Sequence, residues 1–452
     1  MYHRATPAGW RHNRKTNMQS KRLYTIMMLA AIGAASVVSA QSEHWTEARK
    51  AIHHDINLCG SNYTAYPDPT QPLTPAPKGY EPFYLSGYAR HGSRWLCGDG
   101  QYRDVIEPLK RASQQGKLTA EGKALLQSVE DFYQGAKGRI GDLTTKGEDQ
   151  HHRIGRRMAQ NFPQIFTAKN SRVDARSTVV IRCILSMEAE CEELTRHFAG
   201  LTVHNDVSQI YQWYLAPNTP DYVREAEKGR NGLESKWRKE LVHPDRFAAR
   251  LFNDATYLRD SVNSERLMRR TFDVCCNMQS HYGAPNLWSY FTEDEAYDLW
   301  TLYNRRHYAE FGASAYTQGK APFKVEALLR NFLSTADTIV SRKDYHGATL
   351  RFGHEVFLMP LAALMELGHV GERVENVDTL DRVWANSTIF PMAGNIQLIF
   401  YRPKKGRQGD ILVKALLQER EMTLPVAPVQ FPYYRWDDLK AYYTHKLDHA
   451  RD

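Results

Sequence analysis

Residues 84–95 read YLSGYARHGSRW, an apolar and aromatic run that ends in Arg90-His91-Gly92, with Arg94 two residues later. Such a run is typical of a buried strand, and open α/β sheets bind their ligands where strands end. A neutral imidazole can attack phosphorus, and arginine forks match the oxygens of a phosphate. The stretch therefore predicts an α/β sheet with a phosphate site at the end of this strand.

The same residues have a second interpretation, in which a basic turn follows a buried strand and His91 is half exposed and inactive. Gly92 fits both interpretations, because a glycine allows a tight turn as well as a close approach of the backbone to a ligand. Short motifs of this kind match by chance often enough that the rest of the chain has to distinguish the two.

Length, composition and net charge limit the kind of protein that this chain can be. The chain has 452 residues, of which 42% are hydrophobic and 24% charged, so it can bury a sizeable core and form two or three domain-sized units. Of the formal net charge of +8, six charges lie in residues 1–40, which contain no acidic residue, so the remainder carries about +2. That balance argues against a nucleic-acid-binding surface.

The N-terminus has the pattern of a secretory signal. Lys21-Arg22 forms a charged start, residues 23–38 are apolar, and Val38-Ser39-Ala40 offers small residues for cleavage after Ala40. We expect a periplasmic or secreted protein with no membrane segment after cleavage, and Met18 is a candidate for the true start. A membrane anchor is the alternative, but the apolar run is short for a bilayer span.

Cysteine and histidine spacings predict no metal centre. The six cysteines are too sparse for a disulfide scaffold in so long a chain, although their number fits an oxidising compartment, and their connectivity stays open. No pair of cysteines or histidines has the spacing of a zinc site. The cysteines are Cys59, Cys97, Cys183, Cys191, Cys275 and Cys276.

A second arginine motif follows another short strand. Residues 173–178 lead into a turn, and a helix then begins with Arg182 in its first turn. The helix dipole disfavours a cation at that end, whereas a bound anion would resolve the conflict. Arg182 is therefore a candidate phosphate ligand, and an ordinary surface arginine is the alternative.

The remaining pattern predicts the architecture. Residues 205–342 are helical in pattern, with Thr292 and Glu295 as a capping box, and a strand then returns and ends in Gly353-His354-Glu355. Two further strands and a terminal helix follow. We expect an α/β fold with a mixed central sheet flanked by helices, formed by residues 41–204 and 343–452, and an all-helical cap inserted at residues 205–342.

Three motifs taken together, Arg90-His91-Gly92-Ser93-Arg94, Arg182 in its strand-turn-helix and Gly353-His354-Glu355, resemble the histidine acid phosphatase family. Phe352-Gly353-His354 with Pro360, and Ala393-Gly394-Asn395, are similar to its multiple inositol-polyphosphate phosphatase branch, which contains phytases. The resemblance covers roughly residues 80–402. Leu96 stands where the family has proline, and Glu355 follows His354 directly, which matches neither His-Asp nor His-Ala-Glu.

The resemblance implies a role for each motif residue. His91 would be the nucleophile that forms a phosphohistidine, and Glu355 would protonate the leaving alcohol. The phosphate would be held by Arg90, Arg94, Arg182 and His354. The implied substrate is a small phosphorylated molecule, inositol polyphosphates such as phytate first, and no metal or other cofactor is implied, because the arginines neutralise the developing charge.

Two alternatives stay open at this point. One is a broad-specificity acid phosphatase that acts on sugar phosphates or nucleotides. The other is a catalytically silent relative that binds anions, which the unusual order of His354 and Glu355 makes conceivable. The oligomeric state stays open as well.

Overall fold

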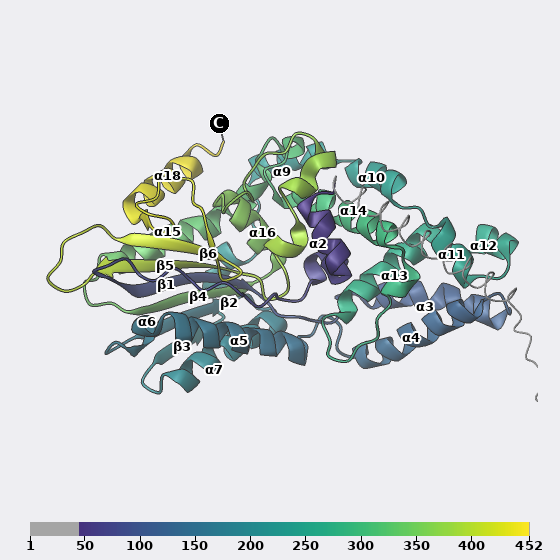
Figure 1. Ribbon diagram of the computed structural model, residues 1–452, viewed down its shortest axis with the longest axis horizontal. Helices are drawn as coiled ribbons and strands as arrows, with labels where there is room; N and C mark the ends of the chain where they lie inside the picture. Colours follow the sequence, from purple (N-terminus) through teal and green to yellow (C-terminus); the bar gives the residue numbers. More distant parts are fainter. Residues whose placement is uncertain (1–44, 452) are drawn as a thin grey trace, which may run out of the picture. The chain divides into compact units, whose positions relative to one another are not determined.

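The computed structural model describes residues 45–451 of the chain (Figure 1). The predicted signal segment, residues 1–40, lies outside the described residues. The chain divides into two compact units, Met1–Lys50 and Ala51–Asp452. Every named element after helix α2 (Glu47–His54) belongs to the second unit. Within residues 45–451, no helix combines the length and the apolar composition that a bilayer span requires.

An eight-stranded sheet runs through the second unit in the order β3-β2-β4-β1-β5-β6-β7, with β8 paired to β6. Strands β3, β2, β4 and β1 are parallel, and β5 to β8 are joined by antiparallel pairing. The predicted mixed sheet is therefore confirmed. The strands are Tyr80–Arg90 (β1), Arg172–Ser177 (β2), Thr202–Asp206 (β3), Gly347–Gly353 (β4), Asn395–Pro403 (β5), Leu412–Leu417 (β6), Arg420–Met422 (β7) and Tyr434–Arg435 (β8).

Side chains of β1 alternate between the two faces of the sheet, as the period of a strand requires. Tyr84 and Tyr88 join one apolar cluster with α15, α16 and α18, whereas Leu85 and Ala89 join another with α5, α6 and α7. The two groups of helices lie on opposite sides of the sheet in Figure 1. These helices are Thr145–Asn161 (α5), Pro163–Thr167 (α6), Ile181–His197 (α7), Glu326–Val340 (α15), Glu355–Leu364 (α16) and Trp436–Asp448 (α18).

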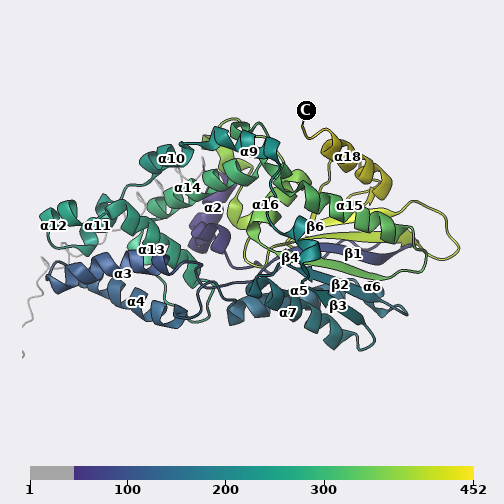
Figure 2. The same ribbon diagram turned by 180° about the vertical axis from the view of Figure 1, so that it is seen from behind.

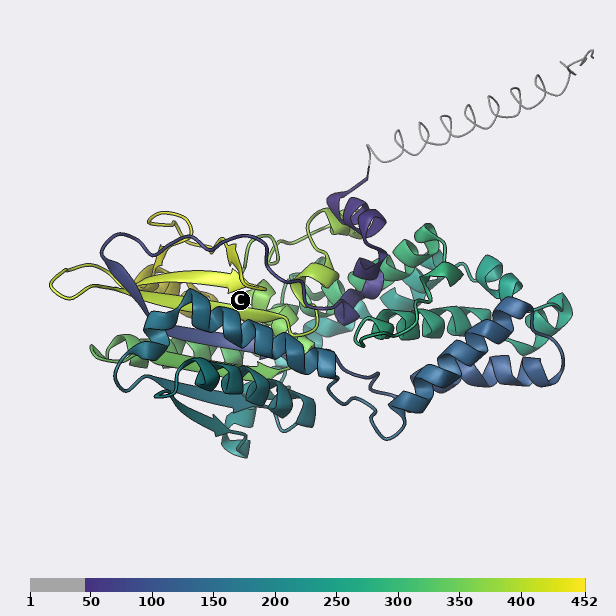
Figure 3. The ribbon, with the colours of Figure 1, turned by 60° about the horizontal axis from the view of Figure 1, so that its bottom comes forward.

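A helical part of this unit is assembled from two separate stretches of sequence. Figure 3 shows the blue helices α3 and α4 beside the teal helices that follow β3. Arg266 of α13 pairs with Asp104 of α3 at 2.8 Å, and Thr119 before α4 donates to the carbonyl of Arg250 in α11 at 2.6 Å. The helices are Asp99–Gln114 (α3), Ala120–Ala136 (α4), Gln212–Leu215 (α8), Asp221–Glu227 (α9), Leu233–Leu241 (α10), Asp245–Leu251 (α11), Ala255–Ser261 (α12), Ser264–Met278 (α13), Glu293–Phe311 (α14) and Asn386–Ile389 (α17).

The cap boundaries at residues 205 and 342 remain a prediction, and two features of the fold were not foreseen. Helices α3 and α4 precede the predicted cap yet pack against α11 and α13, which lie inside it. Strand β3 has the polar and largely exposed sequence TVHND at the sheet edge, so it lacks the apolar pattern by which a strand is recognised. The capping box of Thr292 and Glu295 at α14 is confirmed.

Candidate active site

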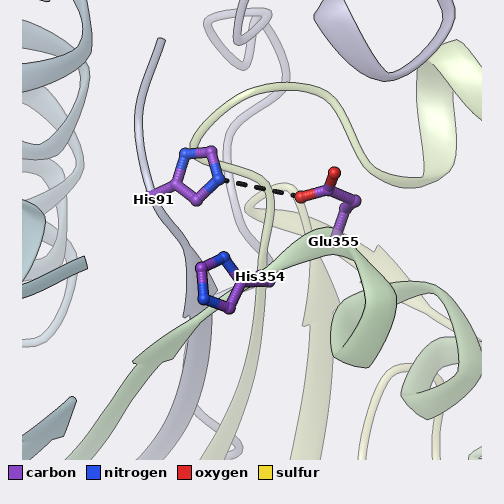
Figure 4. A group of neighbouring side chains, drawn as sticks. All are labelled: His91, His354 and Glu355. Carbon is purple, nitrogen blue, oxygen red and sulfur yellow. Dashed lines mark ion pairs between the residues drawn. The ribbon is translucent and has the colours of Figure 1, made fainter. Parts of the chain in front are cut away.

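The carboxyl ends of β1 and β4 lie side by side and carry the two predicted histidines. Arg90 is paired with Gly353 across the parallel strands, and the backbone N–H of His91 donates to the carbonyl of Gly353 at 2.9 Å. The imidazole rings of His91 and His354 are 5.5 Å apart, edge to face (Figure 4). The register of two neighbouring strands thus unites motifs that are far apart in the sequence.

His91 is fully buried and held in one tautomer. Its Nδ1 lies 2.9 Å from the carbonyl oxygen of Gly92, and since a carbonyl only accepts, Nδ1 carries the proton. Burial is the largest influence on the pKa of His91 and lowers it well below 6.5; Glu355 opposes this effect, and the charges of Arg90 and Arg94 add to it. The ring is therefore neutral at mildly acid and neutral pH, with an unprotonated Nε2.

Three arginines, Arg90, Arg94 and Arg182, each keep a buried nitrogen without a hydrogen-bond partner. Within residues 45–451, these unpartnered atoms are Arg90 Nη2, Arg94 Nε and Arg182 Nε, and His91 Nε2 is unpartnered as well. Other nitrogens of the same arginines are fixed by backbone carbonyls, because Arg94 donates to Trp95 at 2.9 Å and Arg182 to Gly141 at 3.3 Å. A buried donor without an acceptor costs about 1–3 kcal/mol, which points to an anion as the missing acceptor.

Arg90 has the most constrained position of the three. Its side chain is fully buried, and Nη1 donates to the carbonyls of Asn62 at 2.6 Å and Phe390 at 2.8 Å. Its Nε forms an ion pair with Glu355 Oε2 at 3.2 Å. Nη2 is the part of the fork that remains for a ligand.

His354 shares the positive environment of these arginines. Burial lowers the pKa of His354 to about 4; Glu355 opposes the shift, and the charges of Arg182, Arg90 and Arg94 reinforce it. The hydroxyl of Tyr88 accepts from the backbone N–H of His354 at 2.9 Å and donates to its carbonyl at 3.1 Å. His354 is thus a neutral ring whose backbone is anchored beside His91.

Glu355 begins α16 and is an ionised carboxylate in this structure. Burial on its own would raise the pKa of Glu355, but the charges of Arg90 and, to a lesser extent, Arg94 hold the pKa well below 4.5. Its Oε2 lies 3.7 Å from His91 Nε2, the interaction drawn in Figure 4. The carboxylate therefore occupies the space between His91 and Arg90.

Two glycines allow α5 to approach the loop that carries Arg94. A Cβ on Gly92 would collide with the backbone carbonyl of Gly147, and a Cβ on Gly147 would collide with that of Ser93. Nearby, the backbone N–H of Gly92 donates to Ser186 of α7 at 3.1 Å. The loop is consequently fixed between α5 and α7.

Sequence reasoning missed the residues that enclose the site from the 3-10 helix η1 (Ile56–Tyr63). Asn62 donates from Nδ2 to Glu355 Oε1 at 3.4 Å, in addition to accepting from Arg90 through its carbonyl. Ser61 has an unusual backbone for a non-glycine residue, φ 54° and ψ −125°, and Asn386 donates to its hydroxyl at 2.7 Å. Strained residues cluster at functional sites, but no motif in residues 41–82 marks these positions.

The site also offers the donor atoms of a metal centre. One ligand atom each from His91, His354 and Glu355 lie within 4.8 Å of one another. Two imidazoles and a carboxylate suit several transition metals. However, the charges of three arginines act on this group, and Arg90 already engages the carboxylate. The site formed by these three residues and the arginines around them therefore suits an anion better than a cation.

Comparisons with known proteins agree with the geometry at the level of the fold. No protein-family model and no curated protein sequence matches the chain. Solved structures do match. The multiple inositol polyphosphate phosphatase of Bifidobacterium longum, in complex with phosphate, aligns with a TM-score of 0.65 and 19% identity over 86% of this chain and 98% of that chain.

The phytase of D. castellii aligns with a TM-score of 0.64 and 13% identity over 86% of this chain and 85% of that chain. The phytase of Hafnia alvei aligns with a TM-score of 0.52 and 14% identity over 84% of this chain and all of that chain. The chain has the fold of these phytase-type proteins. The sequence motifs indicate a resemblance to histidine acid phosphatases, and the shared fold confirms that resemblance.

We expect inorganic phosphate to bind at the unpartnered arginine nitrogens. Arg182→Gln should weaken the binding by about tenfold to a hundredfold, because a hydrogen bond to a charged group contributes about 1.5–3 kcal/mol. Titration calorimetry measures the effect, and Arg196→Gln, which removes an exposed arginine near the end of the same helix, is the matched control. Equal phosphate affinities for the two variants would exclude Arg182 from the anion site.

Proposed function

We propose that the protein is a phosphomonoesterase in which His91 takes the phosphoryl group from the substrate. One observation carries the proposal: the buried His91 has its Nε2 unprotonated and unpartnered, among three arginines that each keep an unpartnered nitrogen. A neutral imidazole is a nucleophile, and guanidinium groups neutralise the charge of the transferred group. The fold shared with solved phosphatases and phytases supports the same reaction class.

The first step exchanges one bond to phosphorus for another. Nε2 of His91 donates its electron pair to phosphorus, the ester P–O bond breaks, and the leaving oxygen takes a proton from Glu355. Arg90, Arg94 and Arg182 hold the equatorial oxygens, with His354 as a further polar contact. Proton donation of this kind is worth roughly 10²–10⁴-fold in rate.

The second step restores the protein. Water attacks phosphorus, its proton passes to the Glu355 carboxylate, and the P–N bond breaks with its electron pair returning to Nε2. Inorganic phosphate is the product, and His91 is again neutral. The hydrogen bond from Nδ1 to the carbonyl of Gly92 stabilises the positive charge that the ring carries while it holds the phosphoryl group.

Glu355 has to move and to gain a proton before it can act as the acid. Its carboxylate lies 3.2 Å from Arg90 Nε and 3.7 Å from His91 Nε2, so it stands where the phosphoryl group must bind. A substrate phosphate would displace it from Arg90 toward the leaving group. The negative charge of the substrate then raises the pKa of Glu355, which favours uptake of the proton.

Inositol polyphosphates are the substrate class we propose first. The motifs in residues 352–360 and 393–395 resemble the inositol-polyphosphate branch, and the matched Bifidobacterium protein is described as an inositol polyphosphate phosphatase that was also crystallised with inositol hexasulfate. The predicted signal segment supports a further proposal, that the enzyme acts in the periplasm or after secretion.

The test of the proposed function is phosphate release from phytate and from p-nitrophenyl phosphate with excess EDTA present. Turnover of both substrates is expected, and His91→Ala should reduce it by about 10³-fold or more, as the loss of a nucleophile does in other enzymes. His204→Ala, at an exposed position on β3, is the control for replacement of a histidine. Turnover of p-nitrophenyl phosphate alone would favour the broad-specificity alternative. Binding of phosphate without turnover, by folded protein, would favour the silent relative.

Glu355→Gln should slow phosphate esters of poor leaving groups by about 10²–10⁴-fold and p-nitrophenyl phosphate much less, because only the former need the proton. For the unchanged protein, kcat should fall as pH rises above the pKa that Glu355 has in the substrate complex, since the carboxyl must be protonated there. Initial rates on both substrates between pH 4 and pH 8 measure this. Equal losses on the two substrates would assign the proton donor to another group.

A further inference from the structure

A second cavity of about 580 Å³ lies on the sheet away from the reaction centre. Residues of β2 and β4, of the segment around α8, and of α15 and the turn after it line this groove, and none of them belongs to the site of His91. Thr349, on β4, is four residues before Gly353, which places it about 13 Å from the end of the strand. Figure 2 shows α15 lying across this part of the sheet.

One wall of the groove is cationic. Arg172, Asp174 and Arg176 alternate along β2 and share one face of the strand. Asp174 Oδ1 pairs with Arg172 Nη2 at 2.6 Å and lies 3.6 Å from Arg176 Nη2. Arg342 lines the same cavity, and no acidic side chain in residues 45–451 forms an ion pair with it. With three arginines and one carboxylate, this wall of the groove has a net positive charge.

The other wall is aromatic. Tyr211, Trp213, Tyr214 and Tyr345 line it, and the ring of Tyr211 lies 4.6 Å from the guanidinium of Arg176. Trp213 is 55% exposed, although an indole of this size is normally covered. A flat apolar surface thus stands beside the arginine forks.

One lining residue of the groove and one residue behind the lining have buried polar atoms that lack a partner. Arg351, on β4, does not itself line the groove and is 1% exposed; its Nε donates to the lining residue Asn331 at 2.7 Å and its Nη1 to Ser86 at 3.0 Å. Its Nη2 and the hydroxyl of Tyr345 have no hydrogen-bond partner in the described part of the chain. The unpartnered hydroxyl of Tyr345, which lines the groove, indicates a place for a polar ligand there.

We propose that this groove binds a small anion that carries a flat aromatic ring, of the nucleoside monophosphate class. The ring would stack on the aromatic wall, and the phosphate would engage Arg176 and Arg342. The volume falls within the usual range of small-ligand sites. An inositol polyphosphate offers no aromatic ring to this wall and carries more negative charge than the net positive charge here can balance. The proposal is independent of the proposed function.

The test is calorimetric titration of adenosine monophosphate into the full-length His91→Ala protein, which should not hydrolyse the probe. Trp213→Ala and Arg342→Gln, each added to that protein, should weaken binding at least tenfold. Arg259→Gln, on the exposed helix α12, is the matched charge control, and Arg182→Gln tests the reaction centre; both should leave this binding unchanged. Adenosine and inorganic phosphate should each bind the groove at least tenfold more weakly than the nucleotide.

Two results would overturn the proposal. One is unchanged nucleotide binding in Trp213→Ala and Arg342→Gln proteins that unfold at the same temperature as their parent. The other is loss of all nucleotide binding in Arg182→Gln, which would place the nucleotide at the reaction centre alone. Because binding in the groove requires no turnover, a protein that hydrolyses nothing could still bind the nucleotide there, so the two proposals can fail separately.

Discussion

The burial of the Arg90 guanidinium is the constraint on which the candidate site depends. A buried charge that lacks partners costs several kcal/mol, so the fold has to supply acceptors for it. They come from three distant stretches: the carbonyl of Asn62 in η1, the carbonyl of Phe390 after α17, and the carboxylate of Glu355 at the start of α16. One side chain at the end of β1 thereby fixes the positions of the elements that surround His91.

The same charge determines the protonation states around it. Arg90 and Arg94 act with burial to keep His91 neutral, and against burial they keep Glu355 ionised. The free protein therefore has an unprotonated Nε2 on His91 beside a carboxylate that, in the proposed mechanism, stands where the phosphoryl group would bind. In the proposed mechanism, the negative charge of an incoming phosphate would raise the pKa of the carboxyl group and favour its protonation. The proposed mechanism thus couples substrate binding to protonation of Glu355 through the guanidinium of Arg90.

Much of the fold and the centre of the site can be predicted from the sequence, since both are encoded locally. The apolar run before Arg90 identifies β1, and Arg182 is in the first turn of α7, as its strand-turn-helix pattern predicts. His91 and His354 are expected to lie next to each other once β1 and β4 are placed side by side in the sheet. The ionised state of Glu355 could not be predicted, because it depends on tertiary neighbours.

Other features of the structure cannot be predicted from any local pattern in the sequence. Arg90 is held by backbone carbonyls, which no side-chain pattern reveals, and β3 has the composition of a loop. The second groove depends on the strand order, which places β2 beside β4 although a long helical segment separates them in the chain. Its arginines and aromatic residues therefore look unrelated until the sheet is assembled.

The most direct test of the account is to trap and locate the phosphoryl group during turnover. Protein that is mixed with ³²P-labelled substrate and quenched with alkali within milliseconds should carry a base-stable, acid-labile label. We expect the label on His91 and, because Nδ1 holds the proton donated to the carbonyl of Gly92, we expect it to be attached at Nε2. A label on another residue or on Nδ1 of His91, or full turnover with no labelled protein at any time point, would contradict it.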